Sequence, residues 1–212
     1  MDIYPIDYHH QDMRYNRHSI RLKEYDYSQD GYYFVTTCTQ DRKCLFGEIK
    51  NGKMTLNEFG TIVDNKIHEL KTYKNVDVDI YCVMPNHIHM IIRIVGAGPC
   101  ACPNTGLTRG SWMGSIREWS TGSTQGSTPT VGECVKRLKT LTTRIYIDGI
   151  NHDDWSPFNK RIWQRNFYEH IIRNERELYM IRQYIIDNPK NWEKDRNNEK
   201  NVKITQSTRQ LG

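Results

Sequence analysis

The chain contains no long hydrophobic run. Its 212 residues include no stretch of about eighteen consecutive apolar residues, which excludes a typical transmembrane helix. The hydrophobic fraction is only 37% and the mean hydropathy is -0.77, so we expect part of the chain to lie outside the packed core. The N-terminal residues, which include Asp2 and Asp7, form no apolar signal-peptide segment. We therefore expect a cytoplasmic protein that has no membrane partner.

Motifs for two common kinds of site are also missing. The six cysteines include no paired C-x-x-C spacing, and Cys100 and Cys102 alone are weak evidence for zinc. In a reducing compartment we expect these cysteines to be free thiols. No Walker-type phosphate loop is present, so the sequence predicts no nucleotide cofactor.

The charge is moderately basic. Lys and Arg total 30 against 25 acidic residues, giving a net charge of +5 and a pI near 8.8. This balance suits an anionic partner but falls short of the strongly basic footprint, with a pI above about 9, of a dedicated nucleic-acid-binding domain. Charge alone does not identify the partner.

Composition divides the chain into four parts. We expect an irregular basic arm over residues 1–30, a catalytic domain over 31–190, and a charged tail over 191–212. The domain is interrupted at 96–132, where more than half of the glycines lie among Ser, Thr and Pro without an apolar period. Such a segment cannot bury enough apolar surface to offset its ordering entropy, so we predict a flexible insertion.

Within the domain, apolar periodicity alternates between strand and helix patterns. Asn51-Gly52 indicates a hairpin turn, Asn57 a helix cap, and Asn174 with Glu177 a capping box. We expect strands over 31–39, 76–82 and 87–94, a hairpin over 46–56, and helices over 59–70, 135–145 and 174–188. About four antiparallel strands with helices packed on one face predict an α+β sandwich.

The strand that begins at His87 carries the strongest candidate site. Residues two apart on a strand share a face, so His87 and His89 point one way while Ile88, Met90 and Ile92 point the other. Two converging imidazoles form part of a small metal site. The alternative is a pair of incidental histidines on a strand.

The last helix offers partners for such a metal. Tyr184 and Asn188 are four residues apart and share a helix face. Asn188 would supply an amide oxygen, and Tyr184 would stand beside the metal as a nucleophile. Oxygen ligands suit Mg²⁺ or Mn²⁺, and imidazoles shift the preference toward Mn²⁺ or Zn²⁺.

Each residue also has a simpler interpretation. A tyrosine on an amphipathic helix usually packs at the core boundary, and Tyr168 and Tyr179 are rivals of Tyr184 on the same evidence. Asn188 before Pro189 is equally explained as a helix stop. The basic residues after the insertion form, in most proteins, only a solvated helix face.

Three segments together resemble one family. Met84-Pro-Asn-His-Ile-His-Met-Ile resembles the histidine–hydrophobe–histidine (HUH) motif of the single-tyrosine transposases. The segment 162–173, followed by Tyr184-Ile-Ile-Asp-Asn-Pro, resembles the REP-associated tyrosine transposase branch, as does the segment 17–27. The likeness covers most of the chain outside the insertion and the two ends. The insertion itself is not part of the usual pattern.

The resemblance implies a ferredoxin-like sandwich that cleaves and transfers single-stranded DNA at hairpin-forming repeats. It implies Tyr184 as the nucleophile of a 5′-phosphotyrosine intermediate, with His87, His89 and Asn188 holding a divalent ion, Mg²⁺ or Mn²⁺. The REP-associated branch implies a monomer, whereas the broader group often forms homodimers. We expect DNA contacts from basic residues of the arm, the helix after the insertion and the matched segment: Arg17, Arg21, Lys136, Lys139, Arg144, Arg165 and Arg173.

Two other functions stay open on the sequence. The first is a non-catalytic binder of structured DNA or RNA that keeps the fold. The second is a zinc protein that uses His87 and His89 with a cysteine such as Cys82 or Cys134.

Overall fold

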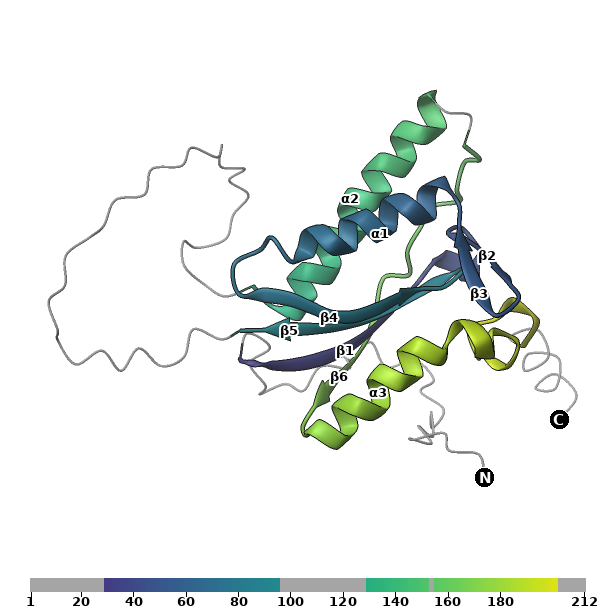
Figure 1. The fold of residues 1–212 in the computed structure, drawn as a ribbon. Coiled ribbons are helices and arrows are strands. Elements are labelled where there is room, and N and C mark those ends of the chain that lie inside the picture. The colour runs from purple at the N-terminus through teal and green to yellow at the C-terminus, as the bar shows by residue number, and fades with distance from the viewer. Residues whose placement is uncertain (1–28, 96–128, 153–154, 202–212) are drawn as a thin grey trace, which may run out of the picture.

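A four-stranded antiparallel sheet forms the centre of the molecule (Figure 1). The computed structural model describes residues 29–95, 129–152 and 155–201. The strand order is β4-β5-β1-β6, so β5 and β1 are inner strands. The strands are β1 (Gly31–Cys38), β4 (Val76–Val83), β5 (His87–Ile94) and β6 (Tyr168–Ile172).

The order of elements along the chain is that of a ferredoxin-like fold. Strand β1 is followed by helix α1 (Glu58–Leu70), β4, β5, helix α2 (Val131–His152) and β6, which is a βαββαβ arrangement. The predicted α+β class with about four antiparallel strands is confirmed. A separate hairpin, β2 (Gly47–Lys50) and β3 (Lys53–Leu56), lies between β1 and α1, and helix α3 (Glu175–Asp187) follows β6.

Local sequence signals explain where these elements begin and turn. Asn51 and Gly52 both have positive φ, 52° and 69°, as a type I′ hairpin turn requires. The Asn57 side chain accepts a hydrogen bond of 2.8 Å from the Gly60 N–H and caps α1. Asn174 accepts one of 2.9 Å from the Glu177 N–H and caps α3. The predicted hairpin turn and both caps are confirmed.

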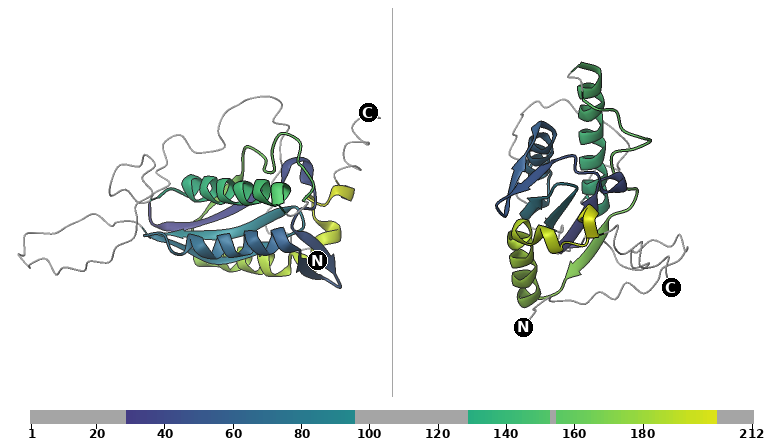
Figure 2. Two further views of the ribbon diagram at one scale, coloured as in Figure 1. Left: turned by 90° about the horizontal axis from the view of Figure 1, so that it is seen from above. Right: turned by 90° about the vertical axis from the view of Figure 1, so that its right-hand side faces the viewer.

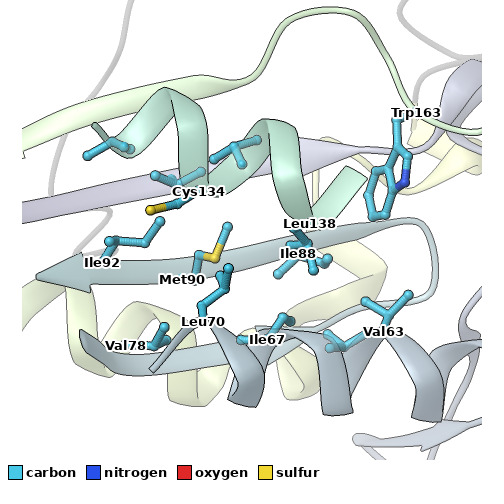
Figure 3. Close-up of a cluster of buried hydrophobic side chains, with 14 of the residues drawn as sticks. Val63, Ile67, Leu70, Val78, Ile88, Met90, Ile92, Cys134, Leu138 and Trp163 are labelled. Carbon is cyan, nitrogen blue, oxygen red and sulfur yellow. The ribbon is translucent and has the colours of Figure 1, made fainter. Parts of the chain in front are cut away.

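The helices divide between the two faces of the sheet (Figures 1 and 2). Helices α1 and α2 cover one face, where Ile88, Met90 and Ile92 of β5 lie among their apolar side chains (Figure 3). Helix α3 covers the opposite face and packs Ile181 and Ile185 on Ile91. The sequence predicted all helices on one face. Helix α3 lies on the other face because Ile91 of β5 and Ile172 of β6 form an apolar surface there for Ile181 and Ile185.

The described part of the C-terminal tail is packed. A 3-10 helix, η2 (Pro189–Lys194), continues directly from α3, and Asn197 and Asn198 beyond it are buried. No apolar pattern in the sequence predicts this packing, because the buried residues are asparagines whose amides bond to the backbone. For example, Asn198 Nδ2 donates to the Trp192 carbonyl at 3.0 Å. The charged tail predicted over 191–212 is therefore packed where the structure describes it, up to residue 201.

The other predicted segments fall largely beyond the described ranges. Most of the arm over 1–30 and of the insertion over 96–132 lies outside the described residues, and α2 already begins at Val131. Within the described ranges, no helix is both long and apolar enough to cross a bilayer. The cysteines found there, which are Cys38, Cys44, Cys82 and Cys134, are free thiols.

Candidate metal centre and tyrosine site

The histidine pair is buried at the start of an inner strand. His87 is 0% exposed and His89 is 2% exposed, and both lie on the α3 face of the sheet. Their Nε2 atoms are 3.0 Å apart. The strand alternation that placed the two rings on one face therefore also brings their reactive nitrogens to one point.

Neighbouring side chains orient the two rings. Asn86 Oδ1 lies 2.8 Å from His87 Nδ1, and because an amide oxygen only accepts, Nδ1 of His87 carries the proton. His87 Nε2 therefore presents a lone pair. Thr36 Oγ1 lies 2.7 Å from His89 Nδ1, and a hydroxyl can serve either tautomer of that ring. Such partners on the far ring nitrogen are typical of metal-binding histidines.

Burial keeps both histidines neutral. Burial first, and then the nearby Arg196 guanidinium, lower the pKa of His89 to about 3. The pKa of His87 lies well below its usual range because of burial first, and then because of His89, Arg42 and Arg196. Neutral imidazole is the form that ligates a metal.

Helix α3 brings Tyr184 to the histidines. The Tyr184 hydroxyl lies 3.3 Å from His89 Nε2, and its ring packs edge-on against Phe34 with centroids 6.0 Å apart. The side chain is 36% exposed, so solvent reaches the phenol. Of the two rival tyrosines, Tyr179 is 60% exposed, and Tyr168 on β6 packs edge-on against Phe34 at 6.2 Å.

Asn188 follows one helical turn after Tyr184 and is buried, with 4% exposure. Its Oδ1 atom is buried and has no hydrogen-bond partner within the described part of the chain. The chain on both sides of it contacts the histidines, since the Trp192 ring stacks on His87 with centroids 6.0 Å apart. Asn188 is also the residue at which α3 ends, so the helix-stop interpretation holds alongside the ligand interpretation.

Sequence analysis missed Asp195. Its Oδ2 lies 3.5 Å from His87 Nε2, and the side chain is only 6% exposed. Its Oδ1 accepts the Asn197 N–H at 2.6 Å, while Oδ2 has no hydrogen-bond partner in the described ranges. Burial raises the pKa of this carboxyl. No periodicity marks the residue, which stands in the sequence as one charge among many after Pro189.

These atoms fit a divalent ion. The ligand atoms of His87, His89 and Asp195 all lie within 4.8 Å of one another. Among the described residues, the buried oxygens of Asn188 and Asp195 have no hydrogen-bond partner, and a bound cation would satisfy them. Two imidazoles with amide and carboxylate oxygens suit Mn²⁺, and after it Mg²⁺ or Zn²⁺.

Cysteine does not belong to this group within the described residues. Cys134 packs in the apolar core on the α1–α2 side of the sheet. Cys82 lies on β4, and its Sγ contacts the Val83 carbonyl at 3.9 Å and Met84 Sδ at 3.7 Å. The geometry therefore gives the histidine–cysteine zinc hypothesis no support.

The basic residues expected to contact DNA do not gather at the histidines. Lys136 and Arg144 are exposed on α2, across the sheet from the site. The Lys139 ammonium donates to the Gln164 and Asn166 carbonyls at 2.8 and 3.1 Å, and burial lowers its pKa to about 8. Arg165 and Arg173 are exposed on either side of β6, and Arg17 and Arg21 lie outside the described residues.

The fold and site define a ferredoxin-like sheet that carries a buried histidine pair beside a helix-borne tyrosine. The chain is 36% identical over 185 residues to a protein of Haemophilus influenzae named only as uncharacterized, and the match covers 85% of this chain and 92% of the relative. The chain belongs to the same family as this protein. No protein-family model matches it.

Two solved structures are similar in fold. One is a REP-associated tyrosine transposase bound to a REP hairpin, with a TM-score of 0.49 and 17% identity over 80% of this chain and 73% of that chain. The other is a candidate transposase of Deinococcus radiodurans, with a TM-score of 0.41 and 16% identity over 79% of this chain and 95% of that chain.

Proposed function

We propose that the protein is a metal-dependent strand transferase for single-stranded DNA, of the single-tyrosine HUH transposase type. The observation that carries the proposal is the contact of 3.3 Å between the Tyr184 hydroxyl and His89 Nε2. It joins a partly exposed phenol of α3 to a buried pair of neutral imidazoles. The buried, unpartnered oxygens of Asn188 and Asp195 complete a donor set for Mg²⁺ or Mn²⁺.

In the proposed reaction the Tyr184 oxygen attacks a backbone phosphorus. The new oxygen–phosphorus bond links Tyr184 to the 5′ side of the break, and the bond to the 3′ oxygen breaks. The phenol loses its proton and the 3′ oxygen gains one, so the step balances without ATP. A bound divalent ion would neutralise charge on the phosphoryl oxygens. Attack by a 3′ hydroxyl on the phosphotyrosine reverses the step and completes strand transfer.

The chain's own residues have distinct roles in this proposal. Asn86 and Thr36 orient the two imidazoles, and Phe34 supports the Tyr184 ring. A free tyrosine has a pKa near about 10, so its hydroxyl is mostly protonated at neutral pH and depends on the site for activation. Because one chain supplies the tyrosine and both histidines, we propose a monomer as the acting form.

A covalent-adduct assay tests this function. A hairpin oligonucleotide labelled at its 3′ end is incubated with protein and Mn²⁺ or Mg²⁺, and denaturing gels detect labelled protein. We expect an adduct with the wild type, its loss on chelation, and its loss in Tyr184→Phe. The matched control is Tyr179→Phe, which removes an exposed hydroxyl from the same helix and should keep the adduct.

An adduct that persists in Tyr184→Phe would contradict the nucleophile assignment. Salt-sensitive binding without any adduct, across hairpins of varied sequence and without need of a divalent ion, would instead indicate the non-catalytic DNA or RNA binder. The net charge of +5 suits either function, so only the adduct separates them.

A further inference from the structure

Two arginines that are distant in sequence lie together beside the histidine pair. Arg42 ends the short 3-10 helix η1 (Gln40–Arg42) that follows β1, and Arg196 directly follows Asp195. Arg42 Nη1 donates to the Arg196 carbonyl at 2.7 Å. This bond joins the turn after β1 to the C-terminal segment at the edge of the candidate metal centre.

One buried amide sets the position of both arginines relative to the site. Asn86 is 0% exposed, and its Nδ2 donates to the carbonyls of Arg42 and Asn197, each at 2.8 Å. Its Oδ1 accepts from His87 Nδ1 at 2.8 Å. The backbones that carry Arg42 and Arg196 are therefore fixed to the same side chain that orients His87.

The backbone at Arg42 is unusual. Asp41 and Arg42 have φ values of 56° and 53°, in the left-handed region that residues with a side chain rarely adopt. Such conformations persist where the surroundings hold them, and they cluster at ligand sites. Here the bond from the Arg42 N–H to the Thr39 carbonyl, 3.2 Å long, and the bond from Asn86 hold the turn.

Both arginines belong to the segments that Asn86 holds beside His87 through its hydrogen bonds. Arg196 is exposed and so remains available to a ligand, and Arg42 is half-buried. Helix α2 and its cations lie across the sheet (Figure 1), whereas Arg42 and Arg196 lie in the segments bonded to Asn86 at the site itself.

We propose that Arg42 and Arg196 together bind one backbone phosphate of single-stranded DNA at the histidine site. The inference rests on the proposed function, because it names the residues that would hold the anionic substrate there. A guanidinium has five N–H donors in a planar fork, which matches the oxygens of a phosphate. One N–H of Arg42 donates to the Arg196 carbonyl, and the remaining N–H groups would donate to the phosphate.

Binding to a labelled oligonucleotide tests the roles of Arg42 and Arg196 without requiring DNA cleavage. Fluorescein-labelled oligothymidylate is titrated with Tyr184→Phe protein over a range of NaCl, alone and combined with Arg42→Gln, Arg196→Gln or both. Each lost phosphate contact lowers the slope of log K against log salt by about 0.7 for a single strand. We expect a loss of about 0.7 in the double variant and a smaller loss in each single variant, since the remaining arginine still contacts the shared phosphate.

The affinity at low salt should fall by about tenfold or more in each single variant, the loss expected for charge-assisted hydrogen bonds. The charge-matched control is Lys71→Gln with Lys74→Gln, two exposed lysines between α1 and β4, at the end of the sheet away from His87. An unchanged slope in the arginine double variant, or an equal loss in the lysine control, would overturn the proposal. A slope loss of about 1.4 in the double variant would overturn the single shared phosphate.

Two further measurements separate binding from a structural role. Arg42→Lys and Arg196→Lys keep the charge but lose the planar fork, so they should recover most of the salt slope. If lysine fails as glutamine does, the arginines act only through the fold. Mn²⁺ binding, followed by electron paramagnetic resonance, should not weaken in the glutamine variants, because removing positive charge beside the site does not disfavour a cation. Because no step needs cleavage, loss of the covalent adduct and loss of phosphate binding are scored independently.

Discussion

The two faces of β5 are built from alternate residues of one strand, yet they do different work. On the α1–α2 side, Ile88, Met90 and Ile92 are fully buried in the main apolar core. On the α3 side, His87 and His89 are buried to the same degree among polar atoms. The degree of burial is therefore the same on both faces. The faces differ in what is buried: apolar side chains on one, and polar atoms that need a hydrogen bond or a metal on the other.

The difference follows from the cost of burying polar groups. An apolar side chain gains free energy when it leaves water, whereas a polar atom loses it unless a hydrogen bond or a metal compensates. The α3 side retains such uncompensated atoms, Asn188 Oδ1 and Asp195 Oδ2. If stability resides on one face and ligand binding on the other, substitutions on the two faces should change these two properties separately.

The largest effect on stability is expected from Ile92→Ala on the apolar face. Removing a fully buried side chain leaves a cavity and should lower the free energy of unfolding by about 2–5 kcal/mol. Urea denaturation measures the change, and Mn²⁺ binding by the folded fraction should stay as in the wild type. Ile92→Val, at about 0.5–1.5 kcal/mol, is the graded control. A loss of Mn²⁺ affinity in both variants would show that the faces are coupled.

The largest effect on binding is expected from His89→Ala. Loss of an imidazole ligand should weaken Mn²⁺ binding by about a hundredfold or more, since even indirect partners of metal ligands affect affinity by about 10–100-fold. Stability of the metal-free protein should change by less than about 1 kcal/mol, because a desolvated polar ring is removed along with its packing. Titration with Mn²⁺ and urea denaturation with chelator measure the two quantities. Unaltered Mn²⁺ affinity would show that His89 is not a metal ligand.

The histidines should also make the metal-free protein sensitive to acid. The folded pKa of His89 is about 3, below the value of about 6.5 in the unfolded chain. The unfolded state therefore takes up protons first: the contribution is intact above pH of about 6.5 and is lost as pH falls toward 3. Each such histidine adds a slope of up to about 1.4 kcal/mol per pH unit. Burial raises the pKa of the Asp195 carboxyl, so this group acts in the opposite sense.

Denaturation curves of wild type and His89→Gln between pH 7 and pH 5, with chelator present, measure this slope. Glutamine does not titrate, so its slope should be shallower, and other carboxyls cancel in the comparison. Parallel pH profiles for the two proteins would mean that His89 protonates as easily in the folded state as in the unfolded state.

The smallest effect is expected from Asp79→Asn, which weakens the attachment of α3. Asp79 on β4 accepts two hydrogen bonds of 2.7 Å from Arg182 on α3. Because the Arg182 side chain is 39% exposed, solvent screens the pair, and we expect a loss of at most about 1 kcal/mol. Hydrogen exchange of α3 amides measures it. The control, Asp187→Asn, breaks the exposed pair with Lys190 and should have no effect.

Local structure was largely predictable from the sequence. Density of aromatic and β-branched residues predicted β1 and alternation of apolar residues predicted β4. Asn51-Gly52 predicted the hairpin turn, and Asn57 and Asn174 predicted the helix caps. These features depend on a few neighbouring residues, so the sequence contains the information. Strand β6 was not predicted, because it is a short edge strand of mixed polarity.

The sequence by itself determined that His87 and His89 share a face and that Tyr184 and Asn188 share another, because strand and helix periods depend only on spacing. Only the tertiary structure decided that α3 lies on the histidine side of the sheet, opposite α1 and α2. It alone also brought Asp195, Arg42 and Arg196 to the site, through contacts between segments more than a hundred residues apart, such as Arg42 with Arg196 (|i−j| = 154). Packing between distant segments depends on complementary surfaces, and no local pattern records which surfaces will meet.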